Sequence, residues 1–213
     1  MHNLKKGKDK GVLRRTSEET EVTRNEIVTA AIRIFAERGY HNTNMQEIAD
    51  ATGLSRGPLY YHFKNKAALL HEAVKTHIAA ETRHYRDIFR QDKHILQLIR
   101  EDLLYCTRDI RANTPGLFRI PSDDPCLKSI HTMIYNMENA LYKLKEASVR
   151  RAIEKGELRV GTQPRHIVNI MFILYEGLCT TTQMSKIISS IKDIDNAIEF
   201  FLAFIEKEYC TNP

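Results

Sequence analysis

Residues 43–66 have the sequence TNMQEIADATGLSRGPLYYHFKNK, and this stretch decides the fold of the chain. It predicts two short helices joined by a tight turn. Asn44 is placed to cap the first helix, and Glu47, three residues on, can return the hydrogen bond as in a capping box. Gly53 follows at the point where a helix has to stop and turn. This order of elements predicts a helix-turn-helix at about residues 44–63.

The second short helix is expected to have one packing face and one open face. Leu59 and Phe63 are four residues apart and predict the face that packs on the core. Ser55 can cap this helix, and Pro58 lies within its first turn, where its missing N–H costs little. The opposite face carries donors and rings instead of packing groups, namely Arg56, Tyr60, Tyr61 and His62. In a helix-turn-helix, the second helix enters the major groove of DNA.

The sequence GLSRGPLYYHFKNKAALL, residues 53–70, resembles the DNA-binding motif of the tetracycline-repressor (TetR) family of transcription regulators. The similarity extends upstream through RIFAERGYHNTNMQEIADATG and covers about residues 21–81. It is specific because Tyr60, His62, Phe63, Lys66 and Leu69 stand at the family's spacings directly after IADATGLSRG. The resemblance implies a sequence-specific transcription regulator, a repressor that binds a palindromic operator as a homodimer and is released by a small-molecule effector.

Contacts of such a motif with DNA divide into phosphate contacts, which set the register, and contacts to base edges, which read the sequence. Arg56 suits base reading, because its guanidinium can bind O6 and N7 of guanine together. By resemblance to the family, Thr43, Tyr61, His62 and Lys66 match phosphate-contacting positions. For Tyr60 and His62 a purely structural role, in packing or capping, stays open. The expected DNA-binding residues are Thr43, Asn44, Ser55, Arg56, Gly57, Pro58, Tyr60, Tyr61, His62, Lys64 and Lys66.

The rest of the chain shows helical patterns throughout. Thr23 and Glu26 have the spacing of a second capping box and predict the start of the first helix, which Gly39 ends. The later stretches place apolar residues at steps of three and four, and no segment alternates with period two for long enough to form a strand. We expect an all-α fold of about nine helices. Its expected parts are a basic flexible arm (1–20), a helix-turn-helix DNA-binding domain (21–81) and a C-terminal effector-binding and dimerisation domain (82–213).

The composition is that of an ordinary globular protein. Of the 213 residues, 42% are hydrophobic and 28% are charged, which suits one large core or two modest domains. No run approaches eighteen uncharged apolar residues, and no apolar segment follows the basic N-terminus, so neither a transmembrane helix nor a secretory signal is expected. The four cysteines are scattered without a CxxC pair, which favours free thiols in a cytoplasmic protein.

The net charge of +5 is concentrated in the first fifteen residues, which hold six Lys or Arg and one Asp. Everything after this arm therefore sums to zero. Two interpretations stay open. The arm is a solvated, disordered leader, or it adds phosphate contacts or enters a minor groove of DNA.

Aromatic and methionine side chains gather in the C-terminal part. At helical spacing they form either an ordinary core or the walls of an effector cavity, which needs apolar walls and a few polar anchors. The family resemblance favours the cavity. The expected pocket residues are Phe89, Tyr105, Phe118, His131, Met133, Met137, Phe172, Tyr175 and Glu176.

Residues 166–184 are apolar on nearly every side, with Glu176 as their one charge. This pattern predicts a helix that is buried both by its own domain and by a second chain. We therefore expect the dimer contact on this helix and the last one, at Gly177, Leu178, Ile198, Phe201 and Ile205.

Metal binding and catalysis are not expected. His71, His77 and His84 share a helix, but steps of six and seven do not bring them together at metal-ligand distance. The sequence contains none of GxSxG, GxGxxG, a P-loop or HExxH, so we expect no metal, no cofactor and no enzymatic activity. An alternative from a different class is a helical small-molecule-binding or scaffold protein whose helix-turn-helix is vestigial.

Overall fold

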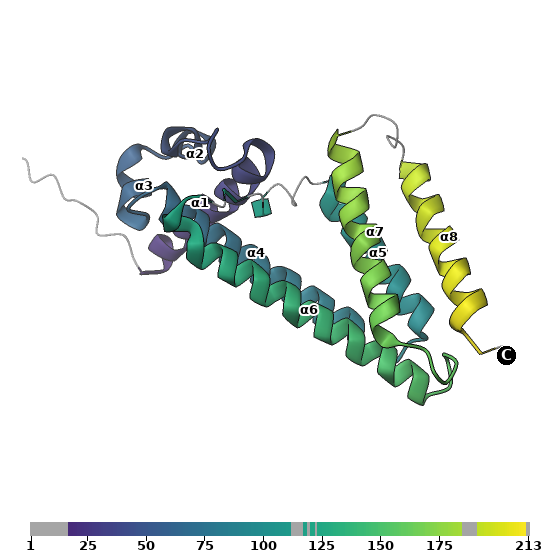
Figure 1. Cartoon of the computed structure of the whole chain (residues 1–213). Coiled ribbons are helices and arrows are strands. Elements are labelled where there is room, and N and C mark those ends of the chain that lie inside the picture. Colours follow the sequence, from purple (N-terminus) through teal and green to yellow (C-terminus); the bar gives the residue numbers. More distant parts are fainter. Residues whose placement is uncertain (1–16, 112–116, 119, 122, 185–190, 212–213) are drawn as a thin grey trace, which may run out of the picture.

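The computed structural model of the chain describes residues 17–111, 117–118, 120–121, 123–184 and 191–211 (Figure 1). Within these residues it contains eight α-helices, short 3-10 turns and no strand, so the expected all-α class is confirmed with eight helices instead of about nine. The elements are α1 (Ser17–Arg38), α2 (Met45–Ala51), α3 (Arg56–His62), α4 (Lys66–Phe89), α5 (Ile95–Arg111), η2 (Pro125–Leu127), α6 (Lys128–Glu154), α7 (Pro164–Met184) and α8 (Ile191–Tyr209).

The first helix starts earlier than the sequence predicts. Thr23 lies inside α1, and its hydroxyl donates to the carbonyl oxygen of Glu19 at 2.9 Å instead of capping a helix start. Glu18 and Glu19 stand in the first turn of α1, where negative side chains interact favourably with the helix dipole. The predicted start at Thr23 is therefore wrong, and residues 17–20 belong to a helix instead of the arm. Residues 1–16, the rest of that arm, lie outside the described residues.

The turns around α2 follow the sequence closely. Asn44 and Glu47 form the predicted capping box, in which each side chain accepts the other's backbone N–H at 3.0 Å. Gly53 has a φ of +67°, the left-handed conformation that ends a helix at little cost for glycine. Asn65 caps α4 by accepting the N–H of Ala68 at 2.8 Å. These local features set where α2 begins, where it ends and where α4 begins.

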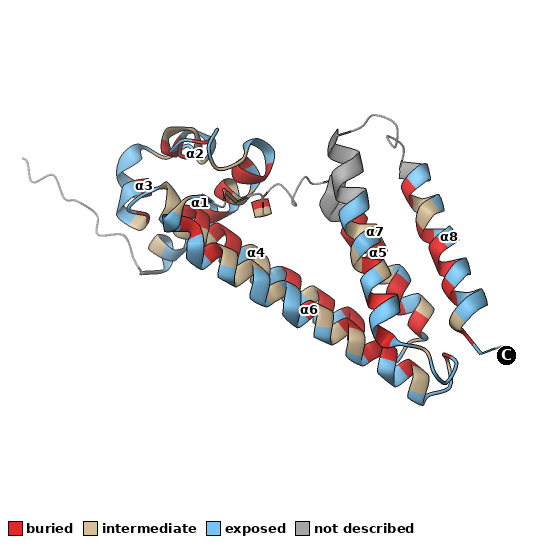
Figure 2. Cartoon of the chain, viewed as in Figure 1, coloured by how far each residue is buried: buried red, intermediate tan, exposed pale blue. Residues whose placement is uncertain are grey.

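Two clusters of buried apolar residues divide the molecule. The N-terminal cluster joins α1, α2, α3 and the first half of α4, and it includes Leu59 and Phe63 as predicted. It also takes in Leu117, Leu127 and Ile130, so residues far beyond 81 complete the core under the helix-turn-helix. The C-terminal cluster joins the second half of α4 with α5, α6, α7 and α8. Figure 2 shows both sets of buried residues along the helices.

The helix α4 is the element that the two clusters share. Leu70 and Val74 are buried in the N-terminal cluster, and Ile88 and Phe89 are buried in the C-terminal one. The helix α6 runs beside α4 for much of its length (Figure 1). The position of α3 is therefore tied to the C-terminal helices through one continuous helix and its neighbour.

None of the helices in the described part of the chain is long and apolar enough to cross a membrane.

Candidate nucleic-acid interface

The helix α3 presents the open face that its sequence predicts. Leu59 is fully buried beneath it, whereas 50% of Tyr60 and 79% of Tyr61 are exposed to solvent. Two large aromatic side chains at this exposure are unusual on a short helix that has an apolar core directly below it. Tyr60 therefore does not pack under the helix, and both rings are available to a partner.

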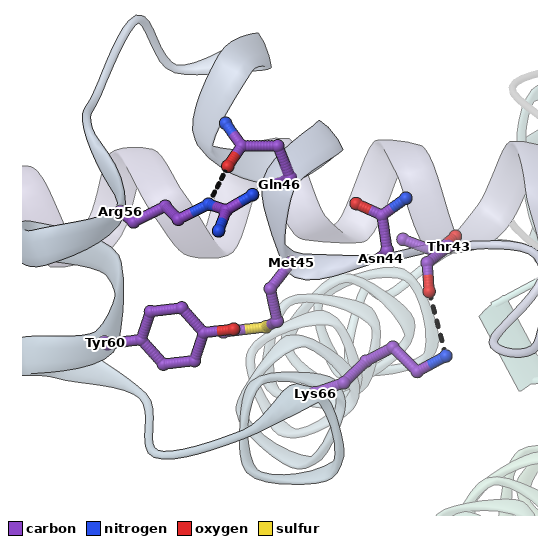
Figure 3. A pocket seen from close by; sticks show the side chains of 7 residues that line it. All are labelled: Thr43, Asn44, Met45, Gln46, Arg56, Tyr60 and Lys66. Atoms are coloured by element: carbon purple, nitrogen blue, oxygen red, sulfur yellow. Dashed lines mark hydrogen bonds between the residues drawn. The ribbon is translucent and has the colours of Figure 1, made fainter.

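A hollow of about 540 Å³ lies between α3 and the segment that leads into α2. Figure 3 shows its lining, to which α3 contributes Arg56 and Tyr60. The other lining residues are Thr43, Asn44, Met45, Gln46 and Lys66. Four of the expected DNA-binding residues therefore converge with Arg56 on one concave surface.

Arg56 is held at the edge of this hollow by a side chain that the sequence analysis did not single out. Its Nε–H donates to Oε1 of Gln46 on α2. Gln46 in turn donates from Nε2 to Oδ1 of Asp50, one helical turn further on, at 2.5 Å. A spacing of four residues on α2 was the available signal for the second of these bonds.

Thr43 and Lys66 serve the protein's own backbone in this structure. The Thr43 hydroxyl is buried and donates to the carbonyl oxygen of Gly39 at 2.8 Å, and the expected phosphate contact of Thr43 stays a prediction. The Lys66 ammonium donates to the carbonyl oxygens of Tyr40 and Thr43 at 2.7 and 2.8 Å and lies 4.3 Å from the centre of the Tyr40 ring. An ammonium has three N–H donors, so one donor of Lys66 is left for a phosphate.

The remaining expected residues surround α3. Ser55 stands at the N-cap position, but its side chain makes no capping hydrogen bond. A Cβ at Gly57 would meet only the Ser55 hydroxyl, at 4.0 Å, so the backbone there is open to close approach. Pro58 lies in the first turn of α3, and Lys64 is exposed just after it. The rings of Tyr61 and His62 meet edge to face at 5.2 Å.

The residues of the expected effector pocket lie in both clusters. Phe89, Met137, Phe172 and Tyr175 belong to or pack on the C-terminal cluster, and Tyr105 packs there too. Phe118 and Met133 instead pack on the N-terminal cluster, and His131 bonds through Nε2 to the carbonyl oxygen of Pro121 at 3.0 Å. The residues of the expected effector pocket are thus divided between the two clusters, and their common cavity stays a prediction.

Phe172 of that set borders a hollow on the described C-terminal helices. This shallow groove of about 220 Å³ is also lined by Tyr135, Glu138, Asn139 and Tyr142. Partial burial, with the nearby charge of Glu176 as a second cause, raises the pKa of Glu138. The groove therefore combines aromatic rings with the carboxylate of Glu138.

A buried polar group in the C-terminal cluster was missed by the sequence analysis. Lys145 donates to Asp102 at 2.8 Å, and its ammonium lies 5.1–5.9 Å from the ring centres of Tyr85, Phe89 and Phe172. Nearby, the Tyr105 hydroxyl donates to the buried Glu81 at 2.6 Å. The available signal was a charged residue inside an apolar stripe, as at Glu81 on α4.

The expected dimer residues on α8 face inward. Ile198, Phe201 and Ile205 are 0%, 7% and 0% exposed and pack in the C-terminal cluster of their own chain, so their assignment to a contact between chains is wrong. The side chain of Leu178 lies outside the described residues, and Gly177 is exposed. The outward positions are occupied by Phe200 and Phe204 on α8 and Ile173 on α7, which are 78%, 42% and 69% exposed.

Taken with the fold, this geometry defines the class of the protein. Two short helices meet at a left-handed glycine, the second is anchored by a buried leucine, and its open face carries a guanidinium and aromatic rings. The chain is a helix-turn-helix protein, with α3 in the place of the recognition helix.

Comparison with known proteins shows which helix-turn-helix proteins this chain is similar to. Residues 27–73 match the family model described as bacterial regulatory proteins, tetR family. The chain is 44% identical over 70 residues to the HTH-type transcriptional regulator TtgR of Pseudomonas putida, which is 31% of this chain and 33% of that protein. It is 42% identical over 59 residues to AcrR of Shigella flexneri, 28% of this chain and 27% of that protein. The chain thus spans about a third of the length of these curated relatives.

Solved structures with a similar fold align with nine-tenths of this chain or more. NalD, the secondary repressor of the MexAB-OprM multidrug efflux pump in Pseudomonas aeruginosa, superimposes with a TM-score of 0.67 at 22% identity, over 92% of this chain and 100% of that one. The reduced form of E. coli NemR superimposes with a TM-score of 0.68 at 16% identity, over 90% and 100%. Residues 27–73 therefore match the DNA-binding domain of the tetR family of bacterial regulatory proteins, and the rest of the chain is similar to these solved structures in fold alone.

Proposed function

We propose that this protein is a sequence-specific DNA-binding regulator of transcription that acts as a repressor. The observation that carries the proposal is the open face of α3, where Arg56, Tyr60 and Tyr61 are exposed directly above the buried Leu59. The relatives named above are transcriptional regulators, and NalD is a repressor. Because the proposed target is DNA, we place the protein in the cytoplasm and assign it no enzymatic role.

In this proposal the residues around α3 make two kinds of contact with DNA. Arg56 reads a base edge in the major groove, where an arginine pairs best with guanine. Tyr60, Tyr61, His62, Lys64 and the backbone at Ser55, Gly57 and Pro58 contact phosphates or sugars. Lys66 contributes its charge to the same surface while it holds the backbone of residues 40 and 43.

We propose further that the protein works as a homodimer on a palindromic operator. One helix-turn-helix covers one half-site, so a palindrome requires two copies of α3 about one helical turn of DNA, or a multiple of it, apart. Exposed phenylalanines such as Phe200 and Phe204 are typical of an interaction surface. A second copy of the chain is the partner that the palindromic target requires, and we place its contact on this outer face of α8.

A small-molecule effector would act through α4. Three residues separate the end of α3 from the start of this helix, which continues into the C-terminal cluster, where Tyr85 and Phe89 are buried. A ligand that binds the C-terminal helices differently in the DNA-bound and released states shifts operator affinity by its coupling free energy, ordinarily about 1–3 kcal/mol.

The test is selection of duplexes from a random DNA library by the purified full chain. We expect enrichment of an inverted repeat, and binding of the selected duplex that weakens steeply between about 50 and 200 mM salt. A chain that enriches no sequence and binds no duplex at low salt would instead be the helical binding or scaffold protein with a vestigial motif.

A further inference from the structure

Three side chains along the edge of the hollow between α2 and α3 form a continuous line of hydrogen bonds. Asp50 and Gln46 lie one turn apart on α2, and Arg56 is the first residue of α3. The Gln46 amide connects the other two, donating to Asp50 at 2.5 Å and accepting from Nε of Arg56. Figure 3 shows the bond between Gln46 and Arg56 across the gap between the helices.

The chemistry of the three groups permits only one direction for this line. An ionised carboxylate can only accept hydrogen bonds, and a guanidinium can only donate them. Gln46 must therefore turn its NH₂ toward Asp50 and its carbonyl oxygen toward Arg56. The alternative amide orientation would place two acceptors against each other at Asp50 and two donors against each other at Arg56. Asp50 thus fixes the orientation of the amide that holds Arg56.

We propose that Gln46 is a positioning residue for base recognition by Arg56, and that Asp50 sets the amide orientation which this role requires. This inference rests on the proposed function, since it assigns to Gln46 a part in the reading of DNA by α3. Holding Nε leaves the two terminal nitrogens of Arg56 as a free fork. That fork binds O6 and N7 of a guanine through both terminal nitrogens, the paired contact that arginine makes most often with a base.

Positioning contributes to specificity because an exposed arginine otherwise samples many rotamers. Gln46 is half-buried, whereas Arg56 and Asp50 are exposed, so the amide is the more fixed member of the line. A side chain that is held before binding loses less conformational entropy when it contacts its target. The effect falls on the discrimination between guanine and other bases at one operator position, and leaves the phosphate contacts unchanged.

Substitutions at Gln46 separate positioning from direct base contact. Gln46→Met keeps the length of the side chain and removes the acceptor. Gln46→Glu keeps an acceptor for Arg56 and adds a negative charge. Positioning predicts that Gln46→Glu retains the preference for guanine while its affinity falls for every sequence, and that Gln46→Met loses the preference. Direct reading of a base by the Gln46 amide needs both its donor and its acceptor, so both variants would lose it.

Asp50→Asn gives two effects of opposite sign. Removal of the negative charge of Asp50 strengthens binding to every duplex, because that charge repels the DNA phosphates. The new amide no longer opposes the turned orientation of Gln46 at position 50, so the Gln46 oxygen is held toward Arg56 less strongly and discrimination at one position falls. Glu37→Gln, an exposed site on α1, removes the same charge without contact to Gln46 and serves as the matched control.

The experiment measures the affinity of the full chain and its variants for the duplex selected by the wild-type protein, and for duplexes with each base pair replaced. Arg56→Ala first locates the guanine that Arg56 reads. We expect Gln46→Met and Asp50→Asn to reduce preference at that same position by about 5- to 140-fold at most, and Gln46→Glu and Glu37→Gln to keep it. Gln46→Met combined with Arg56→Ala should lose no more preference than Arg56→Ala alone.

A wild-type preference that Gln46→Met leaves intact would overturn the inference while the proposed function stands. So would a loss at a different base position that adds to the loss in Arg56→Ala, since Gln46 would then read its own base. A wild-type chain that prefers no sequence would instead overturn the proposed function itself.

Discussion

Lys145 on α6 and Asp102 on α5 form an ion pair of 2.8 Å that is almost completely removed from water, with the two side chains 8% and 0% exposed. The second carboxylate oxygen of Asp102 has no hydrogen-bond partner in the structure. Burial, opposed by the charge of Lys145, raises the pKa of Asp102. The pair joins α5 to α6 at the centre of the C-terminal cluster, where removal of one partner leaves the other in an apolar surrounding.

Lys145→Met should therefore lower the free energy of unfolding by about 3–5 kcal/mol, because it leaves an unpaired buried carboxyl group. Asp102→Leu combined with Lys145→Met should recover much of this loss, since no charge is then buried. Urea denaturation measures both values. The control is Arg150→Met, which removes a surface ion pair with Glu146 and should cost under about 1 kcal/mol. A loss for Lys145→Met as small as for Arg150→Met would contradict the buried pair.

Phe200 and Phe201 are neighbours on α8 with opposite environments, 78% and 7% exposed. Phe200→Glu should give a folded monomer, because the charge falls on the proposed contact with a second chain. Phe201→Glu should fail to fold, because the charge would be buried in the chain's own core. Sedimentation and circular dichroism distinguish the two results. A folded dimer of Phe200→Glu would remove the contact from this face of α8.

Lys66 and Lys64 carry the same charge next to α3 but differ in their bonds. Lys66 donates to two backbone carbonyls, whereas Lys64 is exposed. Lys66→Met should lower both thermal stability and affinity for every duplex, since it releases the backbone between α1 and α2. Lys64→Met should lower affinity alone and reduce the slope of binding against salt by about one. Equal melting temperatures for the two variants would show that the backbone bonds of Lys66 contribute little.

His77 provides a test of pH dependence. It packs against Phe118 with ring centres 5.3 Å apart, and burial, opposed by Glu81, lowers the pKa of its imidazole. Below about pH 6.5, the ordinary value for histidine, the unfolded chain therefore binds more protons at this site than the folded chain. Stability should fall as the pH drops through this window, and His77→Phe should weaken that fall. The difference between wild type and variant in denaturation at pH 7.5 and 5.5 isolates His77 from the other histidines. A difference that does not change with pH would contradict the burial of His77.

Hydrogen bonds and turns formed by residues a few positions apart in the sequence were the part of the fold that could be predicted. The capping box of Asn44 and Glu47 and the turn at Gly53 depend on residues a few positions apart, and both are present. The start of α1 was misplaced because the Thr23 and Glu26 spacing also occurs inside a helix, where the threonine hydroxyl bonds a carbonyl four residues back.

Contacts between distant segments were the part that could not be predicted. Periodicity shows that Ile198, Phe201 and Ile205 share an apolar face, but it cannot show whether that face meets its own chain or another. The carbonyl bonds of Lys66 and the pairing of Asp102 with Lys145 likewise join segments that are far apart in the sequence. A family pattern gives the positions of such residues without the contacts that they make in this chain.

The central claim is that the open face of α3 reads DNA sequence through Arg56, and fluorescence anisotropy with a selected duplex tests it most directly. Arg56→Ala is compared with wild type and with Arg83→Ala, which removes the same charge from an exposed site on α4. We predict that Arg56→Ala loses about 1–3 kcal/mol of preference at one base pair, whereas Arg83→Ala keeps the wild-type preference at every position. If Arg56→Ala weakened binding equally for all sequences, or only as much as Arg83→Ala, base reading by Arg56 would be contradicted.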